Sequence, residues 1–347
     1  MKKERYFYLD IIRCLACFLV VVMHSMRGGD NANAVVYVAL DTLAKPCNAL
    51  FFMASGALLL PVKTISRDFL RRRLGKIIGP CLIWTLVYNI TQVMWGEQSV
   101  SDMLSLFVNV PFSDKAYGIL WFVYVLIGLY ILAPIITPWL NTTDRLEVKH
   151  YLLLWGGTLL LIKARNFVKF PADERQMLYY FGGYAGYFVL GYYVHKYRPN
   201  ISSALLIIMI ILPFAIALLL RMPSFLEVDR WSVLGYLSLF TALCSFGWFG
   251  FVQKVTTSSF SIKVNLNQEK TFMRCMIVKT SNLTFGVYLV HIIVRNALWK
   301  FPFVISHGCI MELLLTISLS FFISLGIAWG ISKLPYAQYI IGYRKIN

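Results

Sequence analysis

The stretch RCLACFLVVVMHS, residues 13–25, is almost wholly apolar, yet it begins with an arginine and carries a histidine one residue before its end. Apolar runs of this kind recur along nearly the whole chain, which is 59% hydrophobic and 14% charged over 347 residues. Soluble domains are roughly 45–50% apolar and about 25% charged. The composition therefore predicts an all-α protein embedded in a membrane, with residues 13–25 inside its first helix.

Several further segments approach the length of about 20 apolar residues that a transmembrane helix needs. Together with the first helix they predict a polytopic bundle of about ten helices, which forms one integral-membrane domain over residues 1–347. The expected helices are residues 9–26, 40–61, 77–95, 118–139, 150–164, 179–196, 202–221, 232–253, 282–301 and 309–332.

Lysine and arginine give the chain a net charge of +17. They lie in short clusters between the apolar segments, which argues against nucleic acid as a partner. Such clusters indicate the orientation of a membrane protein, because short cytoplasmic loops are rich in positive charge. The clusters lie at residues 2–5, 63–76, 196–198, 254–279 and 344–345. With ten spans they all fall on one side, so we expect both termini to face the cytoplasm.

Three ionisable residues of the first helix share one face. Arg13 and His24 point within about 20° of the same direction and are separated by roughly 16 Å along the axis, at 3.6 residues per turn and 1.5 Å per residue. Asp10 lies three residues before Arg13 and is expected to pair with it. Such groups are costly at membrane depth unless they face the protein interior or a wet cavity, so we expect this stripe to point inward.

More than one role is open for this stripe. An imidazole titrates near pH 6.5 and its neutral form accepts a proton, so His24 suits a general base that activates a hydroxyl. The alternative is a proton path in a secondary transporter or glycan-lipid exporter. Each residue alone also allows a structural role, because Arg13 can reach back to the membrane surface and His24 can make an interhelical hydrogen bond.

Five segments occur together in the order and spacing of a known family, and they are LDIIRCLACFLVVVMH (9–24), LFFMASGALLL (50–60), RRRLGKIIGP (71–80), LWFVYVLIGLYILAPI (120–135) and YLVHIIV (288–294). From about residue 6 to about residue 330 the chain resembles the acyltransferase-3 family of integral-membrane acyltransferases. Within that family it is most similar to bacterial surface-polysaccharide O-acetyltransferases of the enterobacterial common antigen type.

The resemblance implies a multi-pass enzyme of the bacterial cytoplasmic (inner) membrane. It would transfer an acetyl group, or another short acyl group, from cytoplasmic acetyl-CoA as co-substrate to a hydroxyl of a cell-surface or lipid-linked glycan. The family's motifs fall on the pair Arg13 and His24, on Ser55 and Gly56, on Arg72, Arg73 and Lys76, on Trp121, and on Tyr288 and His291. The chain departs from the pattern at Ala57 and Ile119, so the acceptor sugar is left open.

The basic segment KTISRDFLRRRLGK, residues 63–76, supplies the expected acyl-CoA-binding groups, which are Arg71, Arg72, Arg73 and Lys76. Membrane orientation explains their charge by itself. Arginine forks also bind pyrophosphate and ribose phosphate, with lysine adding a point charge, and the resemblance favours that use. The catalytic group is then expected to comprise His24 as base, Arg13 at the cytoplasmic entrance and Asp10 as its partner.

Six further residues are expected to bind substrate, and they are Ser55, Asn48, Trp121, Tyr124, Tyr288 and His291. Some are candidates by residue type only, as hydrogen-bond donors to an oxyanion. Trp121 and Tyr124 share a helix face with Tyr117, and this face either fills the core or stacks on a sugar ring. His291 is either a second acid–base group or a structural one. The expected partners are acyl-CoA, the glycan acceptor and membrane lipid, without a metal; the oligomeric state is not predicted.

Overall fold

The computed structural model describes residues 5–26, 34–103, 120–168, 181–221, 235–257, 272–305 and 309–343, and within these ranges it contains helices and no strand. The chain divides into two compact units. One comprises Met1–Pro61 and Thr137–Ser281, and the other comprises Val62–Ile136 and Asn282–Asn347. Two helices, α7 (Trp121–Thr142) and α14 (Phe272–Leu298), run from one unit into the other. The expectation of a single domain stays a prediction.

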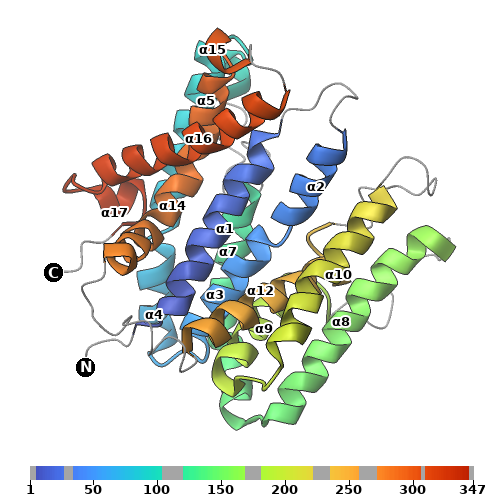
Figure 1. The fold of residues 1–347 in the computed structure, drawn as a ribbon. Helices are drawn as coiled ribbons and strands as arrows, with labels where there is room; N and C mark the ends of the chain where they lie inside the picture. Colours follow the sequence, from blue (N-terminus) through green and yellow to red (C-terminus); the bar gives the residue numbers. More distant parts are fainter. Residues whose placement is uncertain are drawn as a thin grey trace. The chain divides into compact units, whose positions relative to one another are not determined.

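In the first unit α1 (Phe7–Ser25) packs against α2 (Ala34–Ala44), α3 (Cys47–Leu59) and α12 (Leu239–Thr257), as Figure 1 shows. Its buried positions include Leu9, Ile12, Ala16 and Leu19, which recur at the helical spacing of three and four residues. The quoted stretch is therefore helical because one continuous apolar face meets three neighbouring helices.

The expected single helix over residues 40–61 is two helices in the structure. α2 ends at Ala44 and α3 begins at Cys47, with a turn at Lys45 and Pro46 between them. Proline lacks the backbone N–H of the helical ladder and its ring clashes with the carbonyl four residues earlier. Lys45 also forms an ion pair with Asp41 at 3.0 Å, so the break in the apolar segment carries its own charge pair.

Two glycines let α3 approach α9 (Ala185–Tyr197) until their backbones touch. A Cβ built on Gly56 would lie 1.8 Å from the Phe188 carbonyl oxygen, and one built on Gly191 would lie 1.9 Å from the Met53 carbonyl oxygen. The pairs run in opposite directions along the two helices, so the contact is antiparallel. Any side chain at either glycine would force the helices apart.

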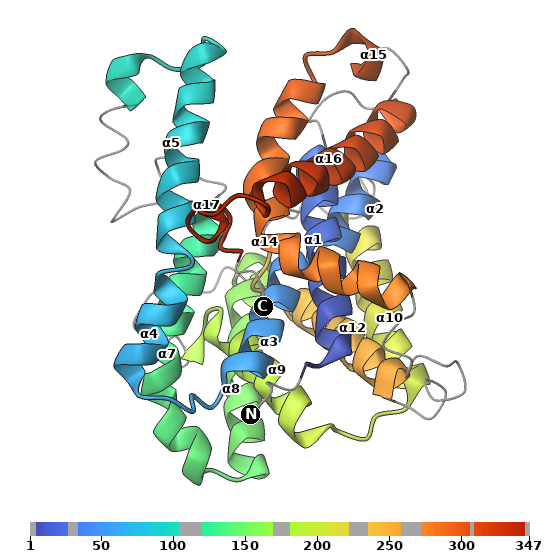
Figure 2. The same cartoon turned by 90° about the vertical axis from the view of Figure 1, so that its left-hand side faces the viewer.

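The remaining helices of the first unit pack around this pair. α8 (Arg145–Val168) packs against α9, and α10 (Ser203–Arg221) packs against α12; Figures 1 and 2 both show the members of each pair side by side. The apolar core of α8 was expected only over residues 150–164, and the observed helix is longer at both ends. Leu153 and Leu160 on α8 are more than half exposed, which is typical of a surface that faces lipid.

The second unit contains α4 (Ser66–Leu74), α5 (Ile78–Met94), α15 (Pro302–Ile305), α16 (Cys309–Ile331) and α17 (Ala337–Ile340), with parts of α7 and α14. The Tyr88 hydroxyl on α5 donates to the Leu289 carbonyl on α14 at 2.5 Å. The Trp84 indole on α5 donates to the Ile340 carbonyl on α17 at 2.8 Å. α17 lies across α5 (Figure 2).

α14 begins ten residues earlier than the expected helix 282–301. Its additional turns contain Arg274 and Lys279, which belong to the cationic cluster 254–279. The side chains of Ser281 and Thr284 are completely buried, so their polarity is directed into protein and not into lipid. Among the described residues, five helical segments are long and apolar enough to cross a membrane, and they are Phe7–Ser25, Ser66–Met94, Trp121–Thr142, Phe272–Leu298 and Ile310–Ile331. The all-α class is confirmed, the count of ten stays a prediction, and so does the placement of both termini in the cytoplasm.

Candidate functional site

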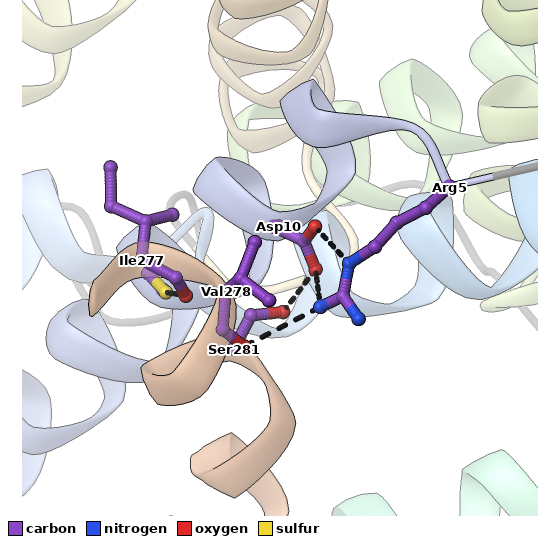
Figure 3. Close-up of polar contacts among 6 residues, drawn as sticks. Arg5, Asp10, Ile277, Val278 and Ser281 are labelled. Carbon is purple, nitrogen blue, oxygen red and sulfur yellow. Dashed lines mark hydrogen bonds and ion pairs between the residues drawn. The ribbon is translucent and has the colours of Figure 1, made fainter. Parts of the chain in front are cut away.

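Asp10, in the first turn of α1, is held by three hydrogen bonds. Its side chain is nearly buried, and its two carboxylate oxygens accept hydrogen bonds from Nε and Nη2 of Arg5, each at 2.8 Å. The Ser281 hydroxyl on α14 donates a third bond at 2.7 Å. Figure 3 shows Arg5 and Ser281 reaching the carboxylate together. Charge-assisted and bidentate bonds of this kind are the strong ones, so Asp10 is fixed in one position.

The first turns of α14 make three further contacts with α1 and with the residue Arg5 that precedes it. Arg5 also donates to the Val278 carbonyl at 3.4 Å (Figure 3). The Cys14 thiol donates to the Ile277 carbonyl at 3.5 Å. The Arg274 guanidinium lies 5.0 Å from the centroid of the Phe7 ring. These contacts fix the rotation of α1 about its axis, and with it the direction of every side chain on that helix.

Arg5 and Ser281 were not identified as site residues from the sequence. The arginine was assigned to membrane orientation, and the serine lies 271 positions from Asp10 along the chain. The expected pairing of Asp10 with Arg13 stays a prediction. Arg13 itself is half-buried on α1, on the same arc of the helix as Asp10.

His24 lies in the last turn of α1, half-buried, with Nδ1 2.9 Å from the Val20 carbonyl oxygen. A carbonyl oxygen only accepts, so Nδ1 carries the hydrogen in this bond. In the neutral imidazole Nε2 is then the nitrogen with the lone pair. The neighbouring Ser25 hydroxyl is buried and donates to the Val21 carbonyl at 2.7 Å, which leaves the histidine as the better candidate for proton transfer.

Two of the expected substrate-binding residues lie on α3, the helix that packs against α1. Asn48 is buried and Ser55 is half-buried. They are seven positions apart, which places them within about 20° of one direction on the helix. Gly56, next to Ser55, is the residue in backbone contact with α9. In this pair Ser55 supplies a hydroxyl, and Gly56 allows the close contact between α3 and α9.

A tyrosine–histidine pair in the first unit was not anticipated from the sequence. The Tyr8 hydroxyl on α1 lies 2.5 Å from Nδ1 of His195 on α9. The Tyr6 ring meets the same imidazole edge-on at 4.6 Å between centroids, and Phe249 packs edge-on against Tyr8. Because Tyr8 and His195 are 187 positions apart in the sequence, no local spacing could reveal the pair.

The expected acyl-CoA-binding cations belong to the second unit, where the basic segment forms a short helix, α4, and not a loop. Arg71 and Arg72 are exposed, and Arg73 and Lys76 are half-buried. Successive helical residues point about 100° apart, so the three arginines spread around α4. Arg72 lies 3.7 Å from Asp68 in an exposed ion pair. Lys76 follows the last turn of the helix.

Tyr288 and His291 are both buried on α14 in the second unit. The tyrosine ring lies between Phe122 and Phe285, at 5.4 and 6.3 Å between centroids. Nδ1 of His291 is 2.6 Å from the Tyr288 carbonyl oxygen, so this imidazole has the same donor arrangement as His24.

Trp121 and Tyr124, the expected sugar platform on α7, are both half-buried. The ring of Trp121 packs edge-on against Phe122. Tyr117, which was expected to continue their face, lies outside the described residues. In the part of the chain that the structure describes, no group of three or more His, Cys, Asp or Glu side chains could hold a metal ion.

A family model described as an acyltransferase domain matches residues 6–333 of the chain. The match covers nearly the whole sequence, so the chain belongs to this family, the acyltransferase-3 family. No curated protein matches the chain, and neither does any solved structure.

Proposed function

We propose that this acyltransferase-3 protein transfers an acyl group, acetyl foremost, from cytoplasmic acyl-CoA to a hydroxyl of a cell-surface or lipid-linked glycan in the bacterial cytoplasmic membrane. Its membership of an acyltransferase family supports the reaction type. Its long apolar helices support a multi-pass membrane setting. The glycan acceptor follows from the resemblance of its motifs to the surface-polysaccharide O-acetyltransferases.

His24 is the proposed general base, and the observation that carries this assignment is its bond to the Val20 carbonyl. With Nδ1 donating, Nε2 accepts the proton of the acceptor hydroxyl. The hydroxyl oxygen attacks the thioester carbonyl carbon, and the tetrahedral intermediate then breaks its C–S bond. The CoA thiolate leaves and takes up the proton from the imidazolium, which returns to the neutral form. Asn48 and Ser55 are the proposed donors to the oxyanion.

Arg13 and Asp10 are proposed to place the donor along α1. Arg13 precedes His24 by roughly 16 Å along the axis, a distance that the pantetheine arm of CoA covers. Asp10 acts through position, because its contacts with Arg5 and Ser281 hold the helix that carries both residues. A guanidinium at Arg13 would attract the negatively charged head of the donor while the thioester extends toward His24.

In the second unit Arg71, Arg72, Arg73 and Lys76 are the proposed phosphate-binding groups. The exposure of the first two on α4 supports a solvent-borne anion as their partner. Trp121, Tyr124, Tyr288 and His291 are the proposed acceptor-binding groups of the same unit. The match to an acyltransferase family includes Arg13 and His24, the residues that would form the proton path of a transporter. Acyl transfer is therefore favoured over transport.

The test is an acyl-transfer assay on the purified protein with acetyl-CoA, together with mass spectrometry of cell-surface glycans from cells that carry each variant. We expect His24→Ala to abolish the acetyl mass increment and the release of free CoA thiol while the protein still reaches the membrane. His150→Ala, on the exposed face of α8, is the matched control and should keep full activity. Glycan acetylation that persists at the wild-type level in His24→Ala would remove this residue from the reaction.

A further inference from the structure

A pocket of about 290 Å³ opens in the first unit, and Asp10, Arg13 and His24 are not among its lining residues. Its walls are the end of α9 with the turn that follows, the start of α10 and the last turns of α12. Two cations, Arg198 and Lys254, line it, with Asn200, Gln253 and Thr257 as the other polar groups. No acidic residue is among the lining residues that the structure describes, so the pocket is positively charged.

The Gln253 side chain shows that the pocket wall offers an unused donor. This residue is 6% exposed, and its Nε2 amino group is buried without a hydrogen-bond partner in the described part of the chain. Buried polar groups nearly always have a partner, because an unsatisfied donor loses its bonds to water without replacement. The Gln253 side chain also contacts the Tyr8 hydroxyl. An amide amino group has two hydrogens, so this contact with Tyr8 can use at most one of them.

Lys254 is already positioned by the protein. Its Nζ donates to the Ile201 carbonyl at 2.6 Å, which holds the ammonium at the start of α10. The positive end of the helix dipole lies at this same terminus. An ammonium has three donors, so this bond positions the group without exhausting it.

Arg198 occupies a backbone conformation that normally belongs to glycine. Its φ is +39° at the end of α9, and it is the one non-glycine residue with a positive φ among the described residues. Helices commonly end with glycine at such a position because a Cβ is disfavoured there. An arginine that occupies this disfavoured conformation on the wall of a cationic pocket indicates a role for its side chain in binding a ligand.

We propose that this pocket binds a phosphate ester, either the headgroup of an anionic phospholipid or a water-soluble phosphate compound. An ionised phosphate presents acceptors, and the wall supplies donors to it from the Arg198 guanidinium fork, the Lys254 ammonium and the Gln253 amide Nε2. The volume accommodates a phosphate with a small polar substituent. The site involves none of the residues assigned to acyl transfer, so its test is independent of that activity.

The test is isothermal titration calorimetry of the purified protein in non-ionic detergent micelles with two probes, glycerol 3-phosphate and dihexanoyl-phosphatidylglycerol. Dihexanoyl-phosphatidylcholine, which has no net charge, corrects for partition into the micelle. We expect saturable binding of at least one charged probe. Binding of both assigns the site to phosphate esters in general, and binding of phosphatidylglycerol alone assigns it to lipid.

Arg198→Gly is the main variant because glycine relieves the positive φ, so the protein should unfold at an unchanged or higher temperature while the probe's Kd rises at least tenfold. Gln253→Glu should abolish binding by placing a carboxylate at the amide position. Lys149→Gln removes one exposed cation from α8 and should leave the Kd within twofold. The proposal is overturned if neither charged probe binds saturably, or if Arg198→Gly and Lys149→Gln change the Kd equally.

Discussion

Replacement of Asp10 by asparagine tests whether the contact between α1 and α14 holds the candidate site. The change keeps the size of the side chain and removes its charge. It converts one of the two acceptor oxygens into an amino group, which cannot accept from Arg5 or Ser281. If this contact fixes the rotation of α1, the variant should lose both stability and acyl transfer, because the proposed role of Asp10 is to hold the helix that carries Arg13 and His24.

The size of the stability loss follows from the geometry. Truncating one partner of a fully buried ion pair costs about 3–5 kcal/mol, whereas an exposed pair is worth about 0.2–1 kcal/mol. The Asp10 side chain is 6% exposed and that of Arg5 is 39% exposed, so water re-solvates much of the arginine charge after the mutation. We therefore expect Asp10→Asn to lower the free energy of unfolding by about 2–3 kcal/mol.

The chain supplies its own control. Asp68 and Arg72 are 3.7 Å apart with side chains 55% and 65% exposed, so Asp68→Asn should cost no more than about 0.5 kcal/mol. The free energy of unfolding is measured in mixed micelles for Asp10→Asn, Arg5→Gln and the double variant. A coupling of about 1–2 kcal/mol between the two sites is expected in this cycle. Additive effects, or equal losses at positions 10 and 68, would refute the reasoning.

Three further predictions concern packing, buried hydroxyls and the donor. Gly191→Ala should destabilise the protein by about 3 kcal/mol or more, because its Cβ would meet the α3 backbone at 1.9 Å, whereas Gly128→Ala, with no atom within 4 Å, should be neutral or stabilising in thermal unfolding. Ser320→Ala should raise the free energy of unfolding by about 1 kcal/mol, since its buried hydroxyl has no partner among the described residues. Ser245→Ala, which removes a 2.6 Å bond, should lower it by a similar amount. Arg72→Gln should raise the KM for acetyl-CoA several-fold with kcat unchanged, as steady-state kinetics will measure.

Each of these has an outcome that contradicts it. Equal unfolding temperatures for the two glycine variants would mean that the α3–α9 contact relaxes freely. A destabilised Ser320→Ala protein would show that this hydroxyl has a partner in the membrane. A lower kcat at unchanged KM in Arg72→Gln would assign the arginine to the chemical step, and unchanged kinetics would leave it with membrane orientation alone.

Most of the helices could be predicted from the sequence, because lipid and core both require long apolar segments and these are visible locally. The errors occur where polar residues are satisfied inside the protein. Pro46 and the Asp41–Lys45 ion pair divide an apolar segment that was expected to be one helix. The polar side chain of Ser281 indicated the end of an apolar segment, so the first turns of α14 were not predicted to belong to that helix. The hydroxyl is buried because it donates to the Asp10 carboxylate, which lies 271 positions away in the sequence.

The candidate site was predictable only in part for the same reason. Asp10, Arg13 and His24 lie on one helix, so helical periodicity and the family motif identified them together. Contacts between distant segments, such as those of Arg5 with Val278 and of Tyr8 with His195, have no local pattern. The sequence thus indicates which residues of α1 are unusual, and the structure adds what holds that helix in place.

The positions of the ionisable groups on α1 explain how an apolar helix accommodates them. Asp10 lies in the first turn and His24 in the last turn, about 26 Å from the beginning of the helix at 1.5 Å per residue. A carboxylate is stabilised at the positive end of the helix dipole, and an imidazolium at the negative end. The carbonyl end of α1 therefore stabilises the charge that the proposed base acquires when it takes a proton. With the N-terminus in the cytoplasm, His24 would lie near the opposite boundary of a hydrocarbon layer of about 30 Å. An acyl donor that enters from the cytoplasm would then meet an acceptor presented from the outer side, which is where a surface glycan is found.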